Sequence, residues 1–380
     1  MLGLSGMKFL IVNMDYPKFL RSLYAKHAAL EKRSYDEQMR VRMASLFGVA
    51  DFYSRNLRTL GHDAWDVHAN NEYMQRAWAR ENGITLSINP LRRFHIQRQR
   101  FPWLALTRNP RWMYEVLAAQ VKHYRPDVLL NQTMVEIGCG FLKEVKPHIR
   151  LLVGQHPAIS LSARNDFSCY DLVVSSFPPT IDYFREKGIP AELNQLAFEP
   201  NVLSFLANQE KTVDISFIGS FLRLHRNRIE LLDAICRHFP MTRIWGPTIK
   251  DTPATSLIQS CYEGQAWGLD MYQKLRNSKI TLNHHGDIPP YANNMRLFEA
   301  TGVGTLLVTD WKQNLHQIFE PGKEVVAYRS AEECVELLRY YLENEEERET
   351  IASAGQRRTL GEHSYYQRMK ELVEIVHKYA

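Results

Sequence analysis

The feature that most constrains this fold is an alternation of short apolar runs with longer amphipathic stretches along the chain. The short runs have the length of buried strands, and the longer stretches have the period of helices. Such alternation is typical of an α/β fold, in which helices connect parallel strands and cover both faces of the sheet. In the first half we expect strands at 8–13, 64–68, 127–131, 150–155, 171–175 and 192–196, and helices at 39–60, 111–124 and 180–187.

The same pattern starts again after Phe198-Glu199-Pro200 and the polar stretch 208–212. A chain of 380 residues is too long for one comfortable hydrophobic core and suits two domains. We predict two Rossmann-like domains, 1–205 and 206–362, that face each other across a cleft. For the last helix, 363–380, we consider packing against the first domain. Strands are expected at 213–218, 242–245, 279–283, 305–309 and 324–328, and helices at 225–237, 268–277, 295–302, 331–344, 346–359 and 365–379.

Composition excludes several classes of protein. With 45% hydrophobic and 23% charged residues the chain is an ordinary folded one. The five cysteines show neither a CxxC pair nor metal-finger spacing, so we expect no disulfide framework, no zinc module and a reducing cytoplasm. No apolar run reaches the roughly 18 residues of a membrane span, and the start leaves no room for a signal peptide. We therefore expect a cytoplasmic protein, with the inner face of a membrane as an alternative.

Arginines and aromatic residues are interleaved between Arg92 and Trp103. Such a patch can face phosphates, nucleic acid or an anionic membrane surface. A solvated loop or hairpin is the more common outcome of a charge run, and we favour it here. Peripheral membrane contact stays open, whereas we expect no nucleic-acid partner, because the net charge of +5 is modest.

The most informative stretch is 291–304, where a polar loop opens a short helix that ends in a Gly-x-Gly turn before a buried strand. The free amides of a helix start can bind a diphosphate, and Arg296 adds a fixed positive charge. Glu299 can accept both hydroxyls of a ribose, as acidic residues do in other nucleotide sites. The alternative is that Arg296 and Glu299, three positions apart, pair with each other on the helix surface. Further donors for the same ligand are Asn293 and Asn294.

A second candidate anion site is Gly219-Ser220, which follows the first strand of the second half. Glycine lets the backbone approach a phosphate closely, although most strand-to-helix turns need a glycine in any case. Of the arginines that follow, we favour Arg226 and Arg228 as donor-binding residues, with surface helix charges as the alternative.

Three residues at predicted strand ends are candidates for proton transfer. Asp15 follows the first strand and is a candidate base for the acceptor hydroxyl, or else stabilises a turn. His156 also ends a strand, and of the pair His284-His285 one member is expected to reach the phosphates or the sugar; we select His285. No histidines have the HExxH spacing, so we predict neither a bound metal nor a cofactor.

The stretch 291–304, together with Phe217-Ile218-Gly219-Ser220 and the segment 319–328, resembles the C-terminal half of glycosyltransferases related to the spore-maturation protein CgeB. These are group 1 glycosyltransferases of GT-B fold. The resemblance implies a nucleotide-diphosphate-sugar donor, with Glu299 on the ribose and Arg296 near the diphosphate. Many retaining members carry a second Glu eight positions before the first, where this chain has Tyr291. Retention or inversion of the sugar therefore stays open, with the loop 292–294 as a substitute for that Glu.

From these observations we expect a metal-independent, hexosyltransferase-type enzyme. It would move a sugar to the hydroxyl of a glycan, lipid-linked or small-molecule acceptor in cell-surface or secondary glycan synthesis. Positive groups would stabilise the departing diphosphate. A sugar-nucleotide epimerase of the same fold and a non-catalytic nucleotide-sugar-binding protein are the alternatives.

Overall fold

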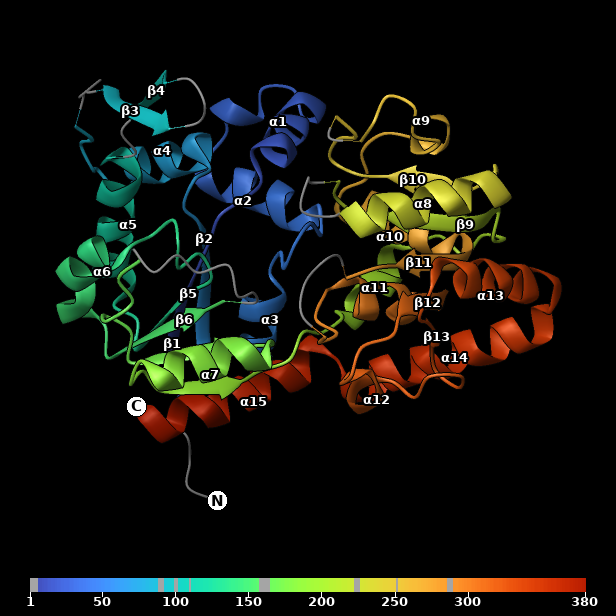
Figure 1. The fold of residues 1–380 in the computed structure, drawn as a ribbon. Coiled ribbons are helices and arrows are strands. Elements are labelled where there is room, and N and C mark those ends of the chain that lie inside the picture. Colours follow the sequence, from blue (N-terminus) through green and yellow to red (C-terminus); the bar gives the residue numbers. More distant parts are fainter. Residues whose placement is uncertain are drawn as a thin grey trace.

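The computed structural model describes residues 6–87, 92–98, 102–108, 111–156, 165–221, 226–250, 252–285 and 290–380. It has two parallel sheets, each covered by helices, that lie side by side in Figure 1. We call the parts built around the first and second sheets the N-terminal and C-terminal domains. The predicted α/β architecture is confirmed. Each predicted strand is present, and its ends differ from the prediction by three residues at most.

The N-terminal sheet has the strand order β2-β1-β5-β6-β7-β8, and all its pairs are parallel. Most of its strands are apolar because helices cover both faces, and β2 is the main exception, with Asp63, Asp66 and His68. The order reverses between β1 and β5, and ligands of such sheets bind beyond the strand ends at this switch point. The strands are β1 (Lys8–Asn13), β2 (Asp63–His68), β5 (Val128–Asn131), β6 (Leu151–Gln155), β7 (Leu172–Ser175) and β8 (Ala191–Leu193). The helices are α1 (Pro17–Lys26), α2 (Tyr35–Ala44), α3 (Phe52–Thr59), α4 (Glu72–Glu81), α5 (Arg111–Tyr124), α6 (Cys139–Val145) and α7 (Pro178–Glu186).

The C-terminal sheet repeats this design with the order β10-β9-β11-β12-β13, and its switch point lies between β9 and β11. Its strands are β9 (Val213–Ile218), β10 (Arg243–Trp245), β11 (Ser278–Asn283), β12 (Leu306–Asp310) and β13 (Val326–Tyr328). The helices are α8 (Arg226–His238), α9 (Ile258–Cys261), α10 (Gly268–Arg276), α11 (Arg296–Gly302), α12 (Leu315–Ile318), α13 (Ala331–Glu343), α14 (Glu345–Glu362) and α15 (Tyr365–Tyr379).

The predicted helix 39–60 is wrong, because the structure divides it into α2 and α3. Between the two helices, left-handed backbone conformations turn the chain, with φ angles of 53°, 61° and 38° at Leu46, Gly48 and Ala50. We call this segment, 45–51, the interdomain loop. The Ser45 carbonyl accepts a hydrogen bond from the Leu269 amide at 2.9 Å.

The interdomain loop also makes an aromatic contact, since the Phe47 ring lies edge-on to Trp267 with 5.1 Å between centroids. At Gly268 a Cβ atom would lie 1.9 Å from the Ser45 carbonyl oxygen, so only glycine allows this approach. Contacts with the other domain thus oppose the helical propensity of the segment.

Two further features differ from the sequence prediction. The helix break lies at His363-Ser364, because Gly361 and Glu362 continue α14 and Ser364 caps α15. Cys139 and Cys169 form a disulfide with their Cα atoms 5.5 Å apart, so the expectation of no disulfide is wrong for this pair. The tail helix α15 packs against α3 of the N-terminal domain.

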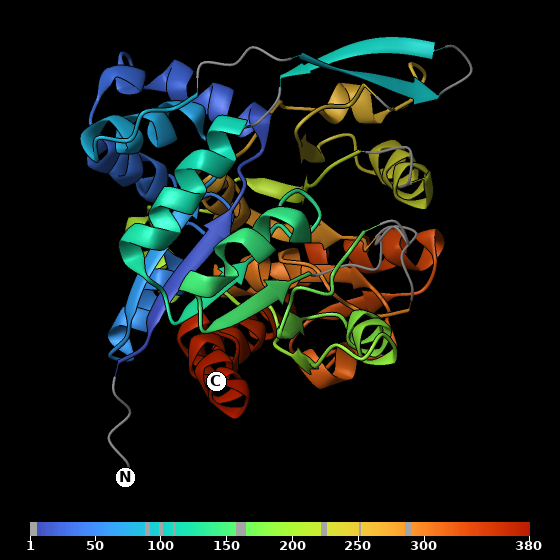
Figure 2. The same cartoon turned by 90° about the vertical axis from the view of Figure 1, so that its left-hand side faces the viewer.

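The interleaved patch 92–103 falls mostly on a β-hairpin of β3 (Arg92–Arg98) and β4 (Pro102–Arg108). The hairpin projects from the N-terminal domain beyond α4 and α5 (Figure 2). Its side chains and residues 99–101 lie outside the described part of the structure.

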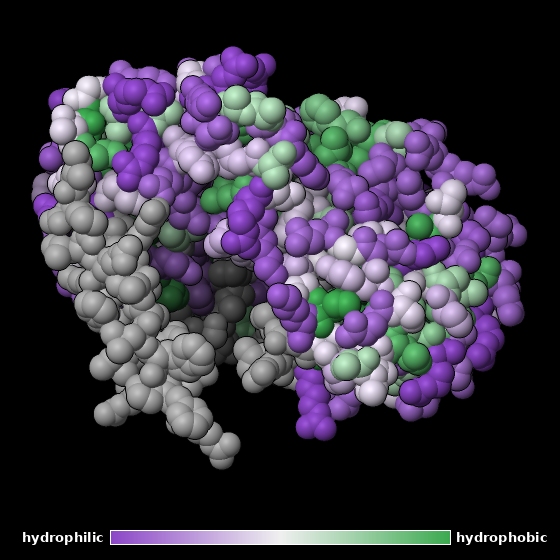
Figure 3. Space-filling model, turned by 90° about the horizontal axis from the view of Figure 1, so that it is seen from above, coloured by the Kyte–Doolittle hydropathy of each residue, from purple (hydrophilic) through white to green (hydrophobic). Residues whose placement is uncertain are grey.

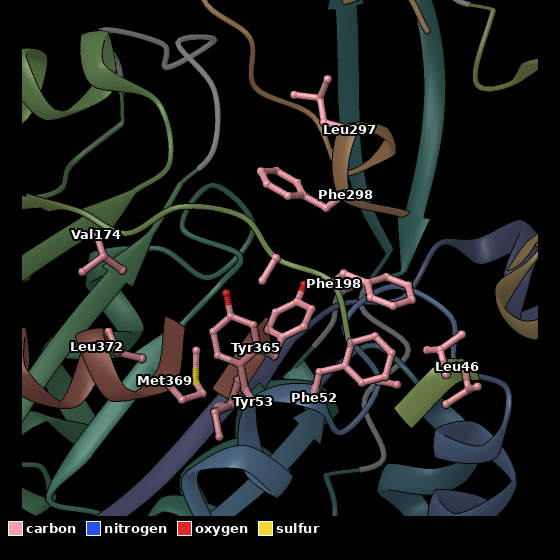
Figure 4. Close-up of a cluster of buried hydrophobic side chains, with 14 of the residues drawn as sticks. Leu46, Phe52, Tyr53, Val174, Phe198, Leu297, Phe298, Tyr365, Met369 and Leu372 are labelled. Atoms are coloured by element: carbon pink, nitrogen blue, oxygen red, sulfur yellow. The ribbon is translucent and has the colours of Figure 1, made fainter. Parts of the chain in front are cut away.

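A single apolar core joins the two domains, and Figure 4 shows its central side chains. Phe198, on the segment between the sheets, lies among residues of both domains. Gly302 at the end of α11 packs on its ring so closely that a Cβ atom would lie 2.4 Å away. Phe298 of α11 is buried in the same core, and so is Tyr365 of α15. Helix α11 is therefore fixed where the two domains meet.

His363, at the break between α14 and α15, is buried against the rings of Phe298 and Phe319. Its Nε2 lies 3.0 Å from the Ile318 carbonyl oxygen, and Arg368 Nη2 lies 2.8 Å from its Nδ1. This arrangement suits the neutral ring with Nε2–H as donor and Nδ1 as acceptor. Burial is the main cause that lowers the pKa of His363 to about 4; the hydrogen bond with the Ile318 carbonyl opposes this shift, and the charge of Arg368 adds to it.

The core predicts that Phe298→Ala lowers the free energy of unfolding by about 3–5 kcal/mol, through lost apolar contact and a cavity. The matched control is Phe205→Ala, because Phe205 is 55% exposed and its truncation should change stability by about 0.5 kcal/mol or less. Urea unfolding measures both values. Equal effects of the two changes would contradict the role assigned to Phe298.

Because the pKa of His363 is lowered on folding, the unfolded chain binds its proton between pH 6.5 and about 4 while the folded chain does not. Stability is therefore fully present above pH 6.5 and falls with pH through this window. We expect roughly 2–3 kcal/mol to be lost between pH 7 and pH 4.5 through this residue. Urea unfolding at both pH values should show a smaller loss for His363→Gln than for the wild type. An identical loss would show that other groups control the acid stability.

Candidate active-site cleft

A cavity of about 500 Å³ lies at the carboxyl ends of β1 and β9, where the two domains face each other. Figure 3, seen from above, shows a hollow between the two halves of the molecule. The N-terminal wall consists of the turn after β1 and the interdomain loop. The C-terminal wall consists of the turns after β9, β10 and β11 and the start of α11. This volume is in the range of small-molecule sites.

The turn Gly219-Ser220 after β9 lines the cavity. A Cβ atom at Gly219 would lie 2.7 Å from the Phe217 ring, and one at Gly246 would lie 2.2 Å from the Gly219 carbonyl oxygen. The turns after β9 and β10 therefore pack backbone against backbone. The Gly219 amide donates to the Trp245 carbonyl at 3.0 Å, which fixes the turn in the cavity wall.

Of the two arginines favoured on α8, the structure brings one to the cavity. The buried guanidinium of Arg228 lines it and donates to the carbonyl oxygens of Ser220 at 2.8 Å and His284 at 2.6 Å. Arg228 thus ties together two turns of the cavity wall. Arg226 is exposed, pairs with Glu230 at 3.0 Å and is not among the residues that line the cavity. For Arg226 the surface-charge alternative fits the geometry.

Arg296 Nη1 lies 2.9 Å from Glu299 Oε2. The two residues therefore form the ion pair that the sequence analysis gave as the alternative to ligand binding. The pair lies in the cavity wall and not on an exposed helix face, since each side chain is 13% or less exposed. Arg296 also donates to the Ile218 carbonyl at 3.1 Å, and its buried Nε has no hydrogen-bond partner among the described residues. Burial raises the pKa of Glu299, while Arg296 and a hydrogen bond with Tyr272 oppose that rise.

The two predicted asparagines differ in position. Asn294 lines the cavity, donates to Asn283 Oδ1 at 2.9 Å and accepts from the Leu297 amide at 3.3 Å. It therefore connects β11 to the start of α11. Asn293 is not among the residues that line the cavity. Tyr291 packs edge-on against Phe177 of the N-terminal domain, with 5.8 Å between centroids.

Asp15 lines the cavity but is held in a buried ion-pair network. Arg42 Nη2 lies 2.6 Å from one carboxylate oxygen, and His68 Nδ1 lies 3.2 Å from the other. Although burial alone would raise it, His68 and Arg42 together hold the pKa of Asp15 far below its usual range. This environment disfavours the predicted role of a base.

Among the described histidines, His284 lines the cavity, and His156 and His285 do not. The buried ring of His285 has its Nδ1 2.6 Å from Asp310 Oδ1, and His284 has its Nδ1 3.1 Å from Asp310 Oδ2. Burial lowers the pKa of His156, whose carbonyl accepts a hydrogen bond from Ser175. Asp15 therefore lines the cavity without His156 and His285. Of the pair His284-His285, the residue in the cavity wall is His284 and not the predicted His285.

Sequence reasoning missed the residues through which the N-terminal domain shapes this cavity. Arg42 carries the pairing with Asp15 and donates to the Phe47 carbonyl at 3.2 Å. Tyr16 and Phe47 approach Trp267 from the opposite domain. No spacing pattern predicts the pairing of Asp15 with Arg42 or the contact of Phe47 with Trp267, because the members of each pair are far apart in the sequence.

The described part of the chain contains neither a metal-binding cluster nor a membrane-spanning helix. No three His, Cys, Asp or Glu side chains in it are placed to hold a metal ion. None of its helices is long and apolar enough to cross a membrane.

Residues 226–374 match a family described as "Glycosyl transferase-like". The chain has no significant sequence match among curated proteins. Its fold is similar to that of a glycosyltransferase from Rickettsia africae, with a TM-score of 0.61, 11% identity and 99% of each chain covered. It is also similar to Anabaena HepE in complex with UDP and glucose, with a TM-score of 0.58, 13% identity and coverage of 98% of this chain and 100% of HepE. Sucrose-phosphate synthase from Thermosynechococcus elongatus gives a TM-score of 0.57, 12% identity and 98% coverage of each chain.

Two parallel sheets with facing carboxyl ends, together with these neighbours, confirm the predicted fold class. The C-terminal part of this chain therefore matches a glycosyltransferase family, and the whole chain has the GT-B fold.

Proposed function

We propose that this protein is a glycosyltransferase that moves a hexose from a nucleotide-diphosphate sugar to an acceptor hydroxyl. One observation carries the proposal: the guanidinium groups of buried Arg228 and of Arg296, whose side chain is 13% exposed, line the cleft together with the glycine turn after β9 and the carboxylate of Glu299. Two guanidinium cations suit a diphosphate, and a carboxylate suits a ribose. The similar fold of HepE, seen with UDP and glucose, supports a UDP-sugar as the first donor to test.

In this proposal the diphosphate lies against Gly219-Ser220, between Arg228 and Arg296. The acceptor oxygen forms a bond to the anomeric carbon as the bond from that carbon to the diphosphate breaks. Negative charge then grows on the diphosphate, and the two fixed guanidinium groups stabilise it without having to reorganise. This electrostatic role supports our proposal of a metal-independent transfer.

Glu299 would accept the two ribose hydroxyls. Its buried position makes the ionised carboxylate dependent on Arg296, which lies 2.9 Å away. The pair is therefore a unit: Arg296 keeps Glu299 charged for the ribose and presents its remaining donors to the diphosphate.

On the acceptor side we propose that His284, oriented by Asp310, contacts the reacting groups and takes the acceptor proton. Asp15 acts as a positioning residue, because its carboxylate holds Arg42 and, through it, the interdomain loop. Predicted proton-transfer roles for His156 and His285 find no support in the cavity geometry.

We further propose that the protein belongs to a CgeB-like subfamily, is located in the cytoplasm and acts in cell-surface or secondary glycan synthesis. The acceptor would be a glycan, a lipid-linked sugar or a small molecule. The hairpin of β3 and β4 would be the element that contacts a membrane.

The reaction is tested by incubating the protein with UDP-, GDP-, dTDP- and CMP-sugars, with and without acceptors, and separating the products. A transferase gives a glycosylated acceptor and free nucleotide diphosphate, and without an acceptor at most slow hydrolysis. Conversion of a sugar nucleotide into its epimer would overturn the proposal. Binding of a nucleotide sugar without turnover of any acceptor would favour the non-catalytic alternative.

For the diphosphate site we expect Arg228→Ala to weaken binding of the preferred nucleotide diphosphate about tenfold or more, because a charge-assisted hydrogen bond is lost. Arg226→Ala is the matched control on the same helix, since this exposed arginine pairs with Glu230. Isothermal titration calorimetry measures both affinities, and circular dichroism checks that both variants fold. Equal affinities of the two variants would remove Arg228 from the donor site.

For the ribose site we expect the wild type to bind the ribonucleotide diphosphate about tenfold more tightly than its 2′-deoxy or 3′-deoxy analogue. Glu299→Gln should lose most of this preference. The pKa of Glu299 is raised in the folded protein, so the preference should also decline as the pH falls through that raised value. Titrations over a pH series from 8 downward measure the effect. A preference that persists in Glu299→Gln would place the ribose elsewhere.

A further inference from the structure

A second cavity, of about 320 Å³, lies at the edge of the N-terminal sheet, beside β2, α2, α3 and the end of α5. It shares no lining residue with the active-site cleft. Helix α2 lies between the two, because Met39 and Met43 line this cavity while Arg42 lines the cleft. We call it the β2 cavity.

The β2 cavity contains a buried carboxylate without a counter-charge in contact. Asp66 of β2 is 6% exposed, and its buried Oδ1 has no hydrogen-bond partner among the described residues. Burial raises the pKa of Asp66 to about 7; a hydrogen bond with Ser54 lowers it, and the charge of Asp51 raises it. An unpaired buried carboxylate is costly, so this oxygen is a strong acceptor for a ligand that supplies both a proton donor and a positive charge.

The other charged groups of the cavity make it acidic. Asp36, Asp51 and Asp66 line it together with one guanidinium, from Arg58, and Asp51 is also paired at 3.4 Å with Arg55, which lies outside the lining. Arg58 already donates to the Ala64 carbonyl at 3.2 Å and to Ser54 Oγ at 3.4 Å. The field in the cavity therefore favours a cation.

Aromatic and thioether groups form the rest of the wall. The rings of Trp65 and Tyr124 lie 4.9 Å apart between centroids, and Tyr35 lines the cavity beside them. Electron-rich ring faces attract cations and also pack on apolar carbon. Methionine side chains from α2 adapt to ligands of different shapes.

We infer that the β2 cavity is a binding site for a small organic ammonium ion. Its N–H groups donate to Asp66, and its carbon body packs on Trp65 and Tyr124. A metal ion fits less well, because no three metal-binding side chains are brought together in the described residues, whereas an ammonium group needs no multidentate cage. The site stands apart from the proposed transferase chemistry and does not depend on it.

The test compares two probes that differ in one group, cyclohexylmethylammonium and cyclohexylmethanol, by isothermal titration calorimetry on the full chain. We expect the ammonium probe to bind about tenfold or more tightly than the alcohol, because its charged hydrogen bond to Asp66 is lost in the alcohol. Equal affinities would overturn the inference and indicate a hydroxyl-binding or purely apolar pocket. Absence of binding by the ammonium probe would also overturn it.

Variants locate the binding to this cavity. Asp66→Asn keeps the shape and removes the charge, so it should reduce affinity for the ammonium probe about tenfold or more. Asp63→Asn is the matched control, because Asp63 lies exposed on the same strand outside the cavity. Met39→Trp fills the cavity from α2 without changing the charge and should abolish binding. Unchanged affinity in both Asp66→Asn and Met39→Trp would place the probe elsewhere and overturn the inference.

Discussion

The apolar core that both domains share is the interaction on which the rest of this structure depends. Residues from α3, the segment around Phe198, α11 and α15 converge in it, so neither domain has a separate core on that side. Because protein interiors are closely packed, this contact fixes the position of α11 to within the tolerance of its side chains. Helix α11 carries Arg296 and Glu299, so the geometry of the proposed donor site follows from the hydrophobic packing of Leu297 and Phe298, which lie between them in the sequence.

The charged groups of the cleft are organised by one another. Arg228 joins two turns, Arg296 pairs with Glu299, and Asp15 pairs with Arg42. Buried charges of this kind are tolerated only when they are paired or hydrogen-bonded. Each of these groups thus has a structural role. A bound donor would either replace contacts that are already present or add further hydrogen bonds to them.

Much of the fold could be predicted because the apolar period is a local property of the chain. The strands around Phe9, Ile215 and Leu307 were found from their apolar runs, and the helix 111–124 from its pattern and the Pro126 that follows. The helix predicted over 39–60 failed because contacts with Trp267 and Gly268 impose turns that no local pattern encodes. For the same reason the sequence could propose Arg226 and Arg228 together, but only the direction of helix α8 separates the exposed residue from the buried one.

The sequence by itself determined the positions of the strands in both parallel sheets, the α/β class and the resemblance that pointed to a donor site between Tyr291 and Gly304. Those features depend on periodicity, turn residues and short motifs, which are written in neighbouring positions. The tertiary structure alone decided that Asp15 is held by Arg42, that His284 and not His285 reaches the cleft, and that Oδ1 of Asp66 is buried with no hydrogen-bond partner among the described residues. Burial and pairing arise between residues that are distant in the chain, so they exist only once the two sheets and their helices have packed.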